Sequence, residues 1–298
     1  MSANQKPTLL VTGASGKLGQ RVLELLLEAN AGTIVAATRS PEKLAAFADK
    51  GVIVRQADFG DPASLAEAFK GVDRLLLIST DTIGNRLDQQ IAAVKAAEAA
   101  GVKHVIYTSI ANVQPDSTAQ AAPDHYGTEQ AIINSKMGYT FLRNSIYTDM
   151  LLGSLGQAIS TGTLYAGSGD GKIGYITRED CARAAAAALA DGFEGRRALD
   201  ITGPEAVSQY DVAAIASKIS GKQVTYVPLT LDALISGMVS AGLPQFVAEL
   251  LASFDSATAK GELQVVTSAF EDLTGRKPTS VAEFLEANKQ AFLQPAAH

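Results

Sequence analysis

The chain has 298 residues, of which 47% are hydrophobic and 19% are charged, and its formal net charge is −6. This composition is typical of a soluble globular protein and predicts one dominant domain with a smaller companion. The acidic balance argues against a nucleic-acid-binding surface, and no apolar stretch is long enough to span a bilayer, so we expect a cytoplasmic protein.

An apolar run at the start of the chain, Thr8–Thr12, breaks into spaced glycines and continues as an amphipathic stretch, Gln20–Ala29. The glycines are Gly13, Gly16 and Gly19, a G-x-x-G-x-x-G spacing that is one residue longer than the usual fingerprint. Gly13 permits the tight turn, Gly16 lets a pyrophosphate approach the backbone, and Gly19 allows close packing of helix on strand. The pattern predicts a strand, a phosphate loop and a helix, which is the arrangement of a dinucleotide site.

The whole turn is therefore a candidate for contact with the cofactor. It comprises Gly13, Ala14, Ser15, Gly16, Lys17, Leu18 and Gly19. Lys17 adds a positive charge to an anion site, although a solvated lysine at a helix start is an equally good interpretation.

Short apolar runs alternate with helical patterns as far as residue 142. We expect strands at Thr8–Thr12, Thr33–Ala37, Val52–Arg55, Arg74–Ser79, His104–Ser109 and Tyr139–Leu142. We expect helices at Leu18–Ala29, Pro41–Asp49, Pro62–Phe69 and Arg86–Ala100. The repetition predicts an α/β fold of the Rossmann type, a doubly wound parallel sheet with its ligand crevice at the carboxyl ends of the strands.

The pattern loosens after about residue 145. Helices are expected at Met150–Ile159, Glu179–Ala190, Gln209–Ser220, Leu231–Ala241, Gln245–Leu251 and Val281–Ala291, with strands at Ala198–Ile201 and Gln223–Pro228. We expect residues 1–148 to bind the dinucleotide, and residues 149–298 to form a smaller, mostly helical substrate or lid lobe that shares its core.

The end of the second expected strand indicates which dinucleotide is bound. An NAD site usually carries an acidic residue there for the ribose hydroxyls, whereas this chain has Arg39, which suits a 2′-phosphate. The sequence therefore favours NADPH. Asp58, after the third strand, is placed to accept from the adenine amino group, and an Asx turn is equally plausible.

Polar residues follow the next two strands as well. Ser79 and Thr80 end the fourth strand and Ser109 ends the fifth, all at the expected crevice, with turn capping as the alternative role. His125 either faces the crevice or, as is more common, lies on the surface at a helix start. Lys172, in the glycine-rich stretch 167–174, either lines an entrance or is solvated.

Cys181 lies in an alanine-rich helical stretch, where a buried, unreactive thiol is the expected state. It is the only cysteine of the chain, so no internal disulfide is expected. With three histidines and no cysteine cluster, we expect no metal site.

Several motifs resemble those of the NmrA-like branch of atypical short-chain dehydrogenases. They are the glycine fingerprint 13–19, the run Thr38–Leu44, the stretch Ala100–Ser109, Leu142–Asn144, Gly169–Lys172, Arg178–Asp180, Ile201–Pro204 and Gly275–Ser280. The similarity covers nearly the whole chain and is strongest to the quinone-reducing members of the family.

This resemblance implies a site that holds NADPH and passes a hydride to a flat electrophile such as a quinone. By motif position, the fingerprint and Arg39 would hold the ADP-ribose half, and Ser79 and Thr80 the middle. Asn144, Ser145 and Tyr147 would hold the nicotinamide end. Asn144 and Tyr147 are the catalytic candidates, as donors to the quinone oxygen, with strand-end capping and core packing as nearly equal alternatives. A homodimer is one candidate assembly.

The chain departs from ordinary short-chain dehydrogenases at their Tyr-x-x-x-Lys pair. The nearest match is Tyr126 with Gln130 in the lysine position, and a tyrosine without that cation is a poor general acid–base. Quinone reduction survives this loss, because water can protonate the oxyanion. A redox sensor that binds a dinucleotide without turnover is the competing function, and an isomerase or dehydratase with tightly held NAD is disfavoured by Arg39.

Overall fold

Seven strands form the central sheet of this protein, whose computed structural model describes residues 6–80, 82 and 84–293. The strands are β1 (Thr8–Val11), β2 (Thr33–Thr38), β3 (Ile53–Gln56), β4 (Arg74–Leu77), β5 (His104–Ile110), β6 (Gly138–Asn144) and β9 (Arg196–Ile201). Their order is β3-β2-β1-β4-β5-β6-β9, and the pairs β1–β2, β1–β4, β2–β3 and β4–β5 are parallel. The predicted doubly wound sheet is confirmed, and its order reverses between β1 and β4.

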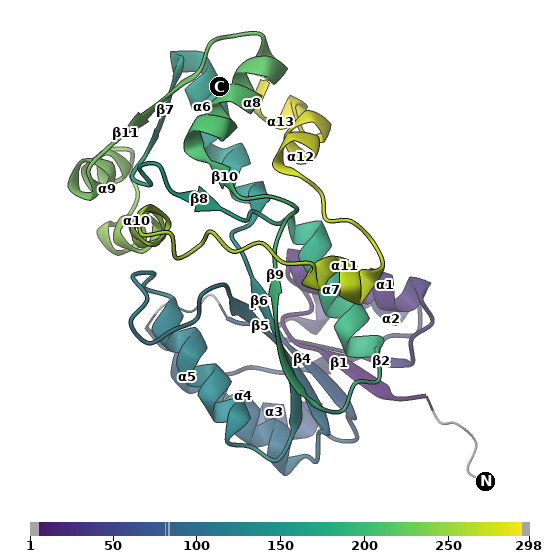
Figure 1. Ribbon diagram of the computed structural model, residues 1–298. Coiled ribbons are helices and arrows are strands. Elements are labelled where there is room, and N and C mark those ends of the chain that lie inside the picture. Colours follow the sequence, from purple (N-terminus) through teal and green to yellow (C-terminus); the bar gives the residue numbers. More distant parts are fainter. Residues whose placement is uncertain (1–5, 81, 83, 294–298) are drawn as a thin grey trace. The chain divides into compact units, whose positions relative to one another are not determined.

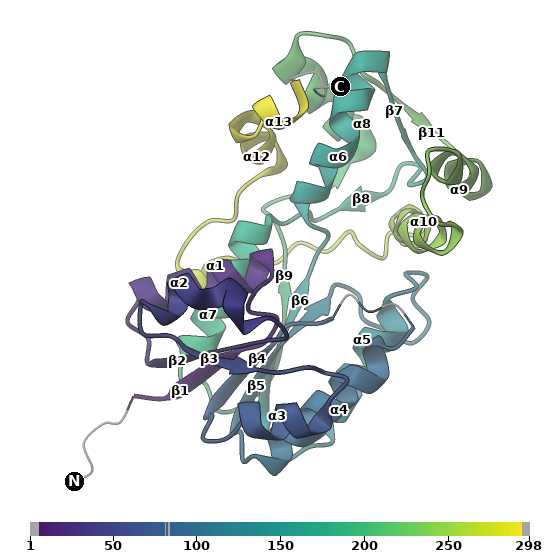
Figure 2. The same cartoon turned by 180° about the vertical axis from the view of Figure 1, so that it is seen from behind.

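Helices cover both faces of this sheet. They are α1 (Lys17–Glu28), α2 (Ala45–Ala48), α3 (Pro62–Ala68), α4 (Arg86–Ala99), α5 (Ala122–Ile133) and α7 (Arg178–Ala190), with the short 3₁₀ helix η1 (Pro41–Leu44) before α2. Figures 1 and 2 show α3, α4 and α5 on one face and α1, α2 and α7 on the other. A buried apolar cluster joins α3, α4 and α5 to the sheet. It includes Leu75, Val105, Tyr107, Phe69 and Val94.

The chain packs into two compact units. Among the described residues, the first takes in those up to 109 together with 124–143 and 181–199, and the second takes in 110–123, 144–180 and those from 200 onward. The assignment of residues 1–148 to dinucleotide binding and 149–298 to a substrate lobe is a statement about function, and it stays a prediction.

The second unit combines helices with two small sheets. Its elements are η2 (Thr148–Leu151), α6 (Leu152–Thr161), β7 (Thr163–Ala166), β8 (Lys172–Ile173), β10 (Val207–Ser208), α8 (Gln209–Ser220), β11 (Thr225–Pro228), α9 (Leu231–Ser240), α10 (Gln245–Ala259), α11 (Ala269–Thr274), α12 (Val281–Ala287) and α13 (Gln290–Leu293). Strands β7 and β11 pair in parallel, and β8 pairs with β10 antiparallel. Its own buried cluster includes Leu155, Tyr175, Val212, Ala216 and Leu285.

Several helices differ from the expectation: α11 is absent from the predicted set, and the predicted helix Val281–Ala291 is divided into α12 and α13. Two further differences, at α5 and α10, have physical reasons. Helix α5 is absent from the predicted set, and Gly127 in its middle is a poor helix former. A Cβ at that glycine would lie 2.7 Å from Cδ1 of Leu87, so the glycine lets α5 pack closely on α4. Helix α10 extends beyond the predicted end at Leu251, because polar residues of its second half form hydrogen bonds in the interior. The hydroxyl of Ser253, for example, accepts from Gln120 N at 3.0 Å.

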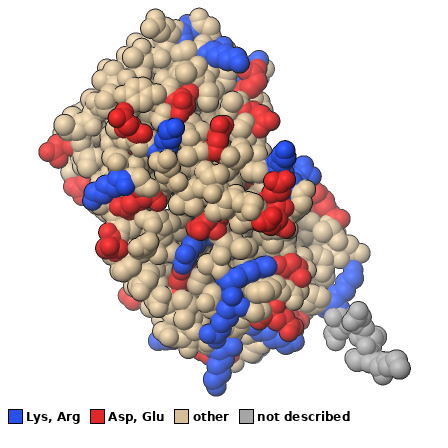
Figure 3. All heavy atoms as spheres, viewed as in Figure 1, with Lys and Arg blue, Asp and Glu red and all other residues tan. Residues whose placement is uncertain are grey.

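Charged side chains of both signs are interspersed over the face drawn in Figure 3. Within the part of the chain that the structure describes, no helix is both long enough and apolar enough to cross a membrane.

Candidate functional site

The turn between β1 and α1 has the geometry of a phosphate loop. Gly13 has φ of +57°, a left-handed conformation that favours glycine. Its carbonyl accepts from Gly16 N at 2.9 Å, and Ala14 N donates to Ala37 O at 3.2 Å, which ties the turn to β2. A Cβ at Gly19 would lie 2.5 Å from Gly13 O and 2.8 Å from Ala14 Cα, so the helix touches the turn directly.

The first turn of α1 offers backbone donors. Gly16 is its N-cap and supplies no side-chain acceptor. The first intrahelical bond runs from Gln20 N to Gly16 O at 2.9 Å, so the N–H groups of residues 17–19 precede it. The Gln20 amide also donates to Ser15 O at 2.8 Å and so holds the loop. Such a helix start attracts an anion through its unsatisfied N–H groups and its dipole.

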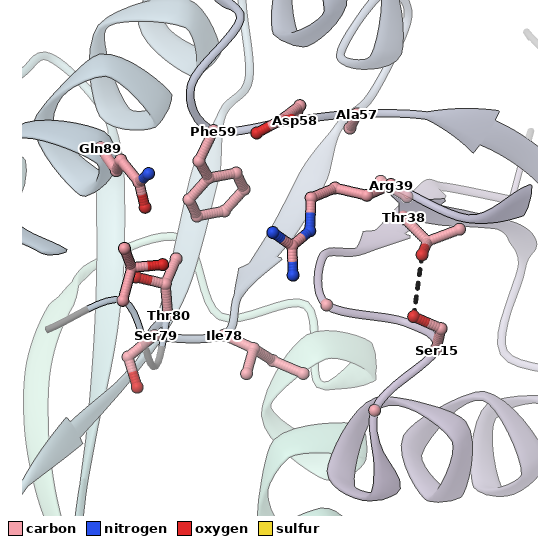
Figure 4. A pocket seen from close by; sticks show the side chains of 14 residues that line it. Ser15, Thr38, Arg39, Ala57, Asp58, Phe59, Ile78, Ser79, Thr80 and Gln89 are labelled. Carbon is pink, nitrogen blue, oxygen red and sulfur yellow. Dashed lines mark hydrogen bonds between the residues drawn. The ribbon is translucent and has the colours of Figure 1, made fainter. Parts of the chain in front are cut away.

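A cavity of about 320 Å³ opens beside this loop, at the carboxyl ends of β1 to β4 (Figure 4). Its lining residues all belong to the first unit and are Gly13, Ser15, Gly16, Ala37, Thr38, Arg39, Ala57, Asp58, Phe59, Ile78, Ser79, Thr80, Thr82 and Gln89. The structure thus brings together seven of the residues singled out by sequence, namely Gly13, Ser15, Gly16, Arg39, Asp58, Ser79 and Thr80. Ala14, Lys17, Leu18 and Gly19 belong to the loop but do not line the cavity, and Lys17 is exposed.

Arg39 follows the last residue of β2, and its guanidinium points into the cavity (Figure 4). Among the described residues it has no hydrogen-bond or ion-pair partner. The neighbouring Thr38 is buried, and its hydroxyl lies 2.8 Å from Ser15 Oγ while accepting from Ser40 N at 3.2 Å. Thr38 therefore locks β2 to the phosphate loop and leaves the guanidinium available to an anionic ligand.

Asp58 makes the Asx turn that was one of its two expected roles, and its contact with adenine stays a prediction. Its Oδ1 accepts from Gly60 N at 2.9 Å, which is an Asx turn, and the residue also lines the cavity. Phe59 lines the cavity beside it, with its ring toward the space in Figure 4. Phe59 was missed by sequence reasoning, although an aromatic residue directly after Asp58 was an available signal. Gln89 was also missed, and the sequence carried no signal for it, because the rotation of α4 about its axis decides whether Gln89 faces the cavity.

Several buried polar atoms in and beside the predicted site have no hydrogen-bond partner among the residues that the structure describes. In the first unit these are Thr80 Oγ1 and Ser109 Oγ, and in the second they are Asn144 Oδ1, Ser145 Oγ and Thr148 Oγ1. Leaving such an atom unpaired costs about 1–3 kcal/mol, and native proteins rarely do so without a ligand or water. Thr148 was not singled out from the sequence, although it stands four residues after Asn144.

Tyr147 lies in the second unit, between β6 and η2. It forms an isolated bridge with Ile176, and the Arg178 guanidinium lies 5.5 Å from the centre of its ring. The guanidinium of Arg178 is itself paired with Asp149 at 2.9 Å. The bridge holds the backbone of Tyr147, and the guanidinium of Arg178 contacts its ring.

The interpretation of His125 as a surface residue is wrong. His125 is buried at 4% exposure, and its Nδ1 lies 2.8 Å from Tyr107 Oη, so it is not a surface residue. Its burial, with the nearby charge of Arg86, lowers its pKa to about 3. The solvated interpretation of Lys172 is confirmed, because its side chain is exposed, and the residue begins the two-residue strand β8.

Tyr126 and Gln130 lie in the same helix, α5, and both are partly buried. Cys181 is buried, as expected. No group of histidine, cysteine or acidic side chains within the described ranges is arranged to hold a metal ion.

A scan against family models matches residues 5–285 to the NmrA-like family. Quinone oxidoreductase 2 of Escherichia coli is 38% identical over 276 residues, which cover 92% of this chain and 96% of that protein. A crystal structure of an E. coli NADPH-dependent quinone oxidoreductase complexed with NADPH superposes with a TM-score of 0.90 at 38% identity, covering 93% and 98% of the two chains. Triphenylmethane reductase of Citrobacter sp., complexed with NADP(H), gives a TM-score of 0.86 at 35% identity, covering 96% and 99%.

Proposed function

This chain belongs to the NmrA-like family, and on that premise we propose that it reduces quinones or similar planar electrophiles with NADPH by direct hydride transfer. The relatives named for quinone reduction and the structures that contain NADPH support this proposal. Membership of the family was expected from the sequence motifs, and it is confirmed.

The observation that carries the proposal is the Arg39 guanidinium, which points into the cavity beside the phosphate loop and has no partner within the described part of the chain. A planar guanidinium binds a phosphate through two parallel N–H donors. A carboxylate in its place would repel a 2′-phosphate. The arrangement therefore selects NADPH over NADH.

The residues of the first unit fit this cofactor. The N–H groups at the start of α1 bind the pyrophosphate, and the absence of a side chain at Gly16 leaves room for it. Asp58 accepts from the adenine amino group, and the Thr80 hydroxyl, buried without a protein partner, bonds to the middle of the dinucleotide. Ser109 Oγ lacks a protein partner in the same way.

At the nicotinamide end, the proposal assigns Asn144, Ser145 and Tyr147 from their positions in the family motif. The two unpaired oxygens, Asn144 Oδ1 and Ser145 Oγ, are the kind of atom that a bound carboxamide would satisfy. When bound, NADPH supplies the hydride. Asn144 Nδ2 and the Tyr147 hydroxyl then donate to the quinone oxygen and stabilise the negative charge that develops on it.

No protein acid is required in this scheme. The quinone gains a hydride at one step and its oxyanion takes a proton from water, so a quinol forms and the atoms and charges balance. Tyr126 has Gln130 in place of the lysine that activates the tyrosine of ordinary short-chain dehydrogenases. The loss of that pair removes alcohol oxidation and leaves quinone reduction intact.

The proposal is tested by the absorbance of NADPH during incubation of the purified protein with a panel of quinones, with NADH alongside. We expect NADPH consumption that depends on both protein and quinone, and slower consumption of NADH. Binding of NADPH without turnover by any quinone would assign the chain to the redox sensors of the family.

Four further expectations from the sequence belong to the same proposal. Residues 1–148 would bind the dinucleotide and residues 149–298 the planar substrate. The protein would work in the cytoplasm without a nucleic-acid partner, and a homodimer is the candidate assembly. Light scattering of the purified protein measures the last of these directly.

A further inference from the structure

The cavity floor, residues 78–80, continues β4 beyond its last residue and takes no part in the strand ladder. Its N–H groups instead donate, in chain order, to Oγ1 of Thr12 at 2.9 Å, to Oγ1 of Thr108 at 2.9 Å and to Oε1 of Gln90 at 3.3 Å. All three accepting side chains are buried, with exposed fractions of 0%, 4% and 0%. Three side chains thus replace the missing strand partner along the floor.

Gln90 is the acceptor that comes from outside the sheet. It lies on α4, and its Nε2 donates to Thr128 Oγ1 of α5 at 2.8 Å. Its Oε1 also accepts from Tyr107 Oη of β5 at 3.4 Å. A backbone N–H can only donate, so the bond from Thr80 fixes which end of the Gln90 amide faces the floor. One side chain therefore joins the floor to a strand and to two helices.

A second side chain of α4 holds the carbonyl of the same residue, Thr80. Arg86, one turn before Gln90, donates from Nε to Thr80 O at 2.7 Å. Its side chain is 13% exposed and lies 3.9 Å from Asp124 Oδ2. With both its N–H and its carbonyl held by α4, Thr80 keeps a fixed backbone, while its buried hydroxyl has no hydrogen-bond partner among the described residues.

We propose that Gln90 and Arg86 are positioning residues that fix Thr80 for contact with the bound dinucleotide. Neither lines the cavity, and both act through the backbone of Thr80. The inference rests on the proposed function, because it names how one residue of that site is held. The family motifs alone would not assign this role, because Gln90 and Arg86 both lie on α4, outside the glycine fingerprint.

The experiment measures the Kd of NADPH by fluorescence titration, which does not depend on turnover. Gln90→Leu removes the acceptor for Thr80 N and leaves an apolar side chain of comparable volume. We expect the Kd to rise about tenfold, the usual effect of one misplaced polar contact. The kcat with a quinone at saturating NADPH should stay within about twofold, because Thr80 is placed away from the reacting atoms.

A matched control separates positioning from general destabilisation. Gln209 is also a buried glutamine at 8% exposure, and its amide donates to the hydroxyl of Tyr175 at 3.0 Å in the second unit. Gln209→Leu should lower the melting temperature as Gln90→Leu does and leave the Kd of NADPH unchanged. Gln90→Glu keeps an oxygen toward Thr80 N, so it should restore the Kd to within about threefold of the wild-type value even where its stability is low.

Arg86→Met provides the second test, and it serves alone if Gln90→Leu does not fold. Its partly exposed site should tolerate methionine, and we expect a Kd about threefold to tenfold above wild type. The inference is overturned if Gln90→Leu or Arg86→Met folds and binds NADPH as the wild type does, or if Gln209→Leu weakens binding equally. Failure of the wild type itself to bind NADPH would instead overturn the proposed function.

Discussion

The hydroxyl of Tyr107 lies 2.8 Å from Nδ1 of His125, in the buried network that also contains Gln90. Both residues are almost fully buried, at 0% and 4% exposure. Burial raises the pKa of Tyr107 and lowers that of His125, so the pair is held neutral. A histidine expected on the surface is thus part of the interior hydrogen bonding.

The burial of His125 predicts a dependence of stability on pH. Its pKa is about 3 in the folded protein, whereas an unfolded histidine has a pKa of about 6.5. Between these values the unfolded state binds the extra proton, so the free energy of unfolding falls as pH falls through this range. His104, with a pKa lowered to about 4 mainly by burial, acts in the same direction.

Denaturant unfolding at about pH 6.5 and about pH 5 measures this effect. The share of His125 should be a loss of roughly 1.5 kcal/mol between the two. His125→Gln, which cannot titrate, should reduce the loss by about that amount, whatever its stability at neutral pH. An unchanged pH dependence in the variant would show that His125 is protonated freely in the folded state.

Arg39→Ala should weaken NADPH binding by roughly 1.5–3 kcal/mol, or about 10- to 150-fold, and leave NADH almost unaffected. Arg39→Asp should do the same or more, because its carboxylate repels the 2′-phosphate. Parallel titrations with the two cofactors give the comparison. Lys70→Ala removes an exposed charge of the same unit that does not line the cavity, and it should change neither affinity. Equal losses for both cofactors would contradict the assignment of Arg39.

Two glycines of the phosphate loop should respond differently to valine. Gly16 has an extended backbone, with φ of −79°, and a Cβ there would meet only Gly13 O at 3.3 Å. Gly16→Val should therefore abolish NADPH binding while the melting temperature of the cofactor-free protein stays near wild type. Gly19→Val should unfold at a lower temperature, because its Cβ would overlap Gly13 O and Ala14 Cα. Normal binding of NADPH by Gly16→Val would show that the loop is a simple turn and does not bind the pyrophosphate.

The proposed mechanism predicts opposite behaviour for Tyr126 and Asn144. Tyr126→Phe should keep most of the quinone reductase activity, because no protein acid is required. Asn144→Ala should lose roughly 10- to 100-fold in kcat through weaker stabilisation of the oxyanion. Steady-state rates, with NADPH binding checked for each variant, distinguish the two. An inactive Tyr126→Phe protein that still binds NADPH would show that Tyr126 is the acid of the reaction and contradict this mechanism.

The sheet and its phosphate loop were predictable because their signals are local. The apolar run ending at Val11, the spaced glycines and Arg39 are consecutive or nearly so, and each has one dominant physical interpretation. The short strands β8 and β10 were missed, because two residues each carry no periodicity. Helix α5 was missed since packing against Leu87, a contact distant in sequence, outweighs the low helix propensity of Gly127.

Outside the phosphate loop, the cavity was predictable residue by residue only where a side chain lies within three residues of a strand's end. Arg39, Asp58, Ser79 and Thr80 all do so, and all line it. The residues that hold the site from behind were not predictable. Gln90 is adjacent in sequence to Gln89, yet one is buried beneath the floor and the other lines the cavity, and only the rotation of α4 decides between them.

The three buried acceptors beneath the floor also affect the thermodynamics of binding. Amide protons of residues 78–80 that are bonded to Thr12, Thr108 and Gln90 should exchange slowly with solvent, although they lie outside every strand. A segment that is already rigid loses little conformational entropy when a ligand arrives. The cavity floor is therefore preorganised: the entropic cost of ordering residues 78–80 arises during folding and not when the dinucleotide binds.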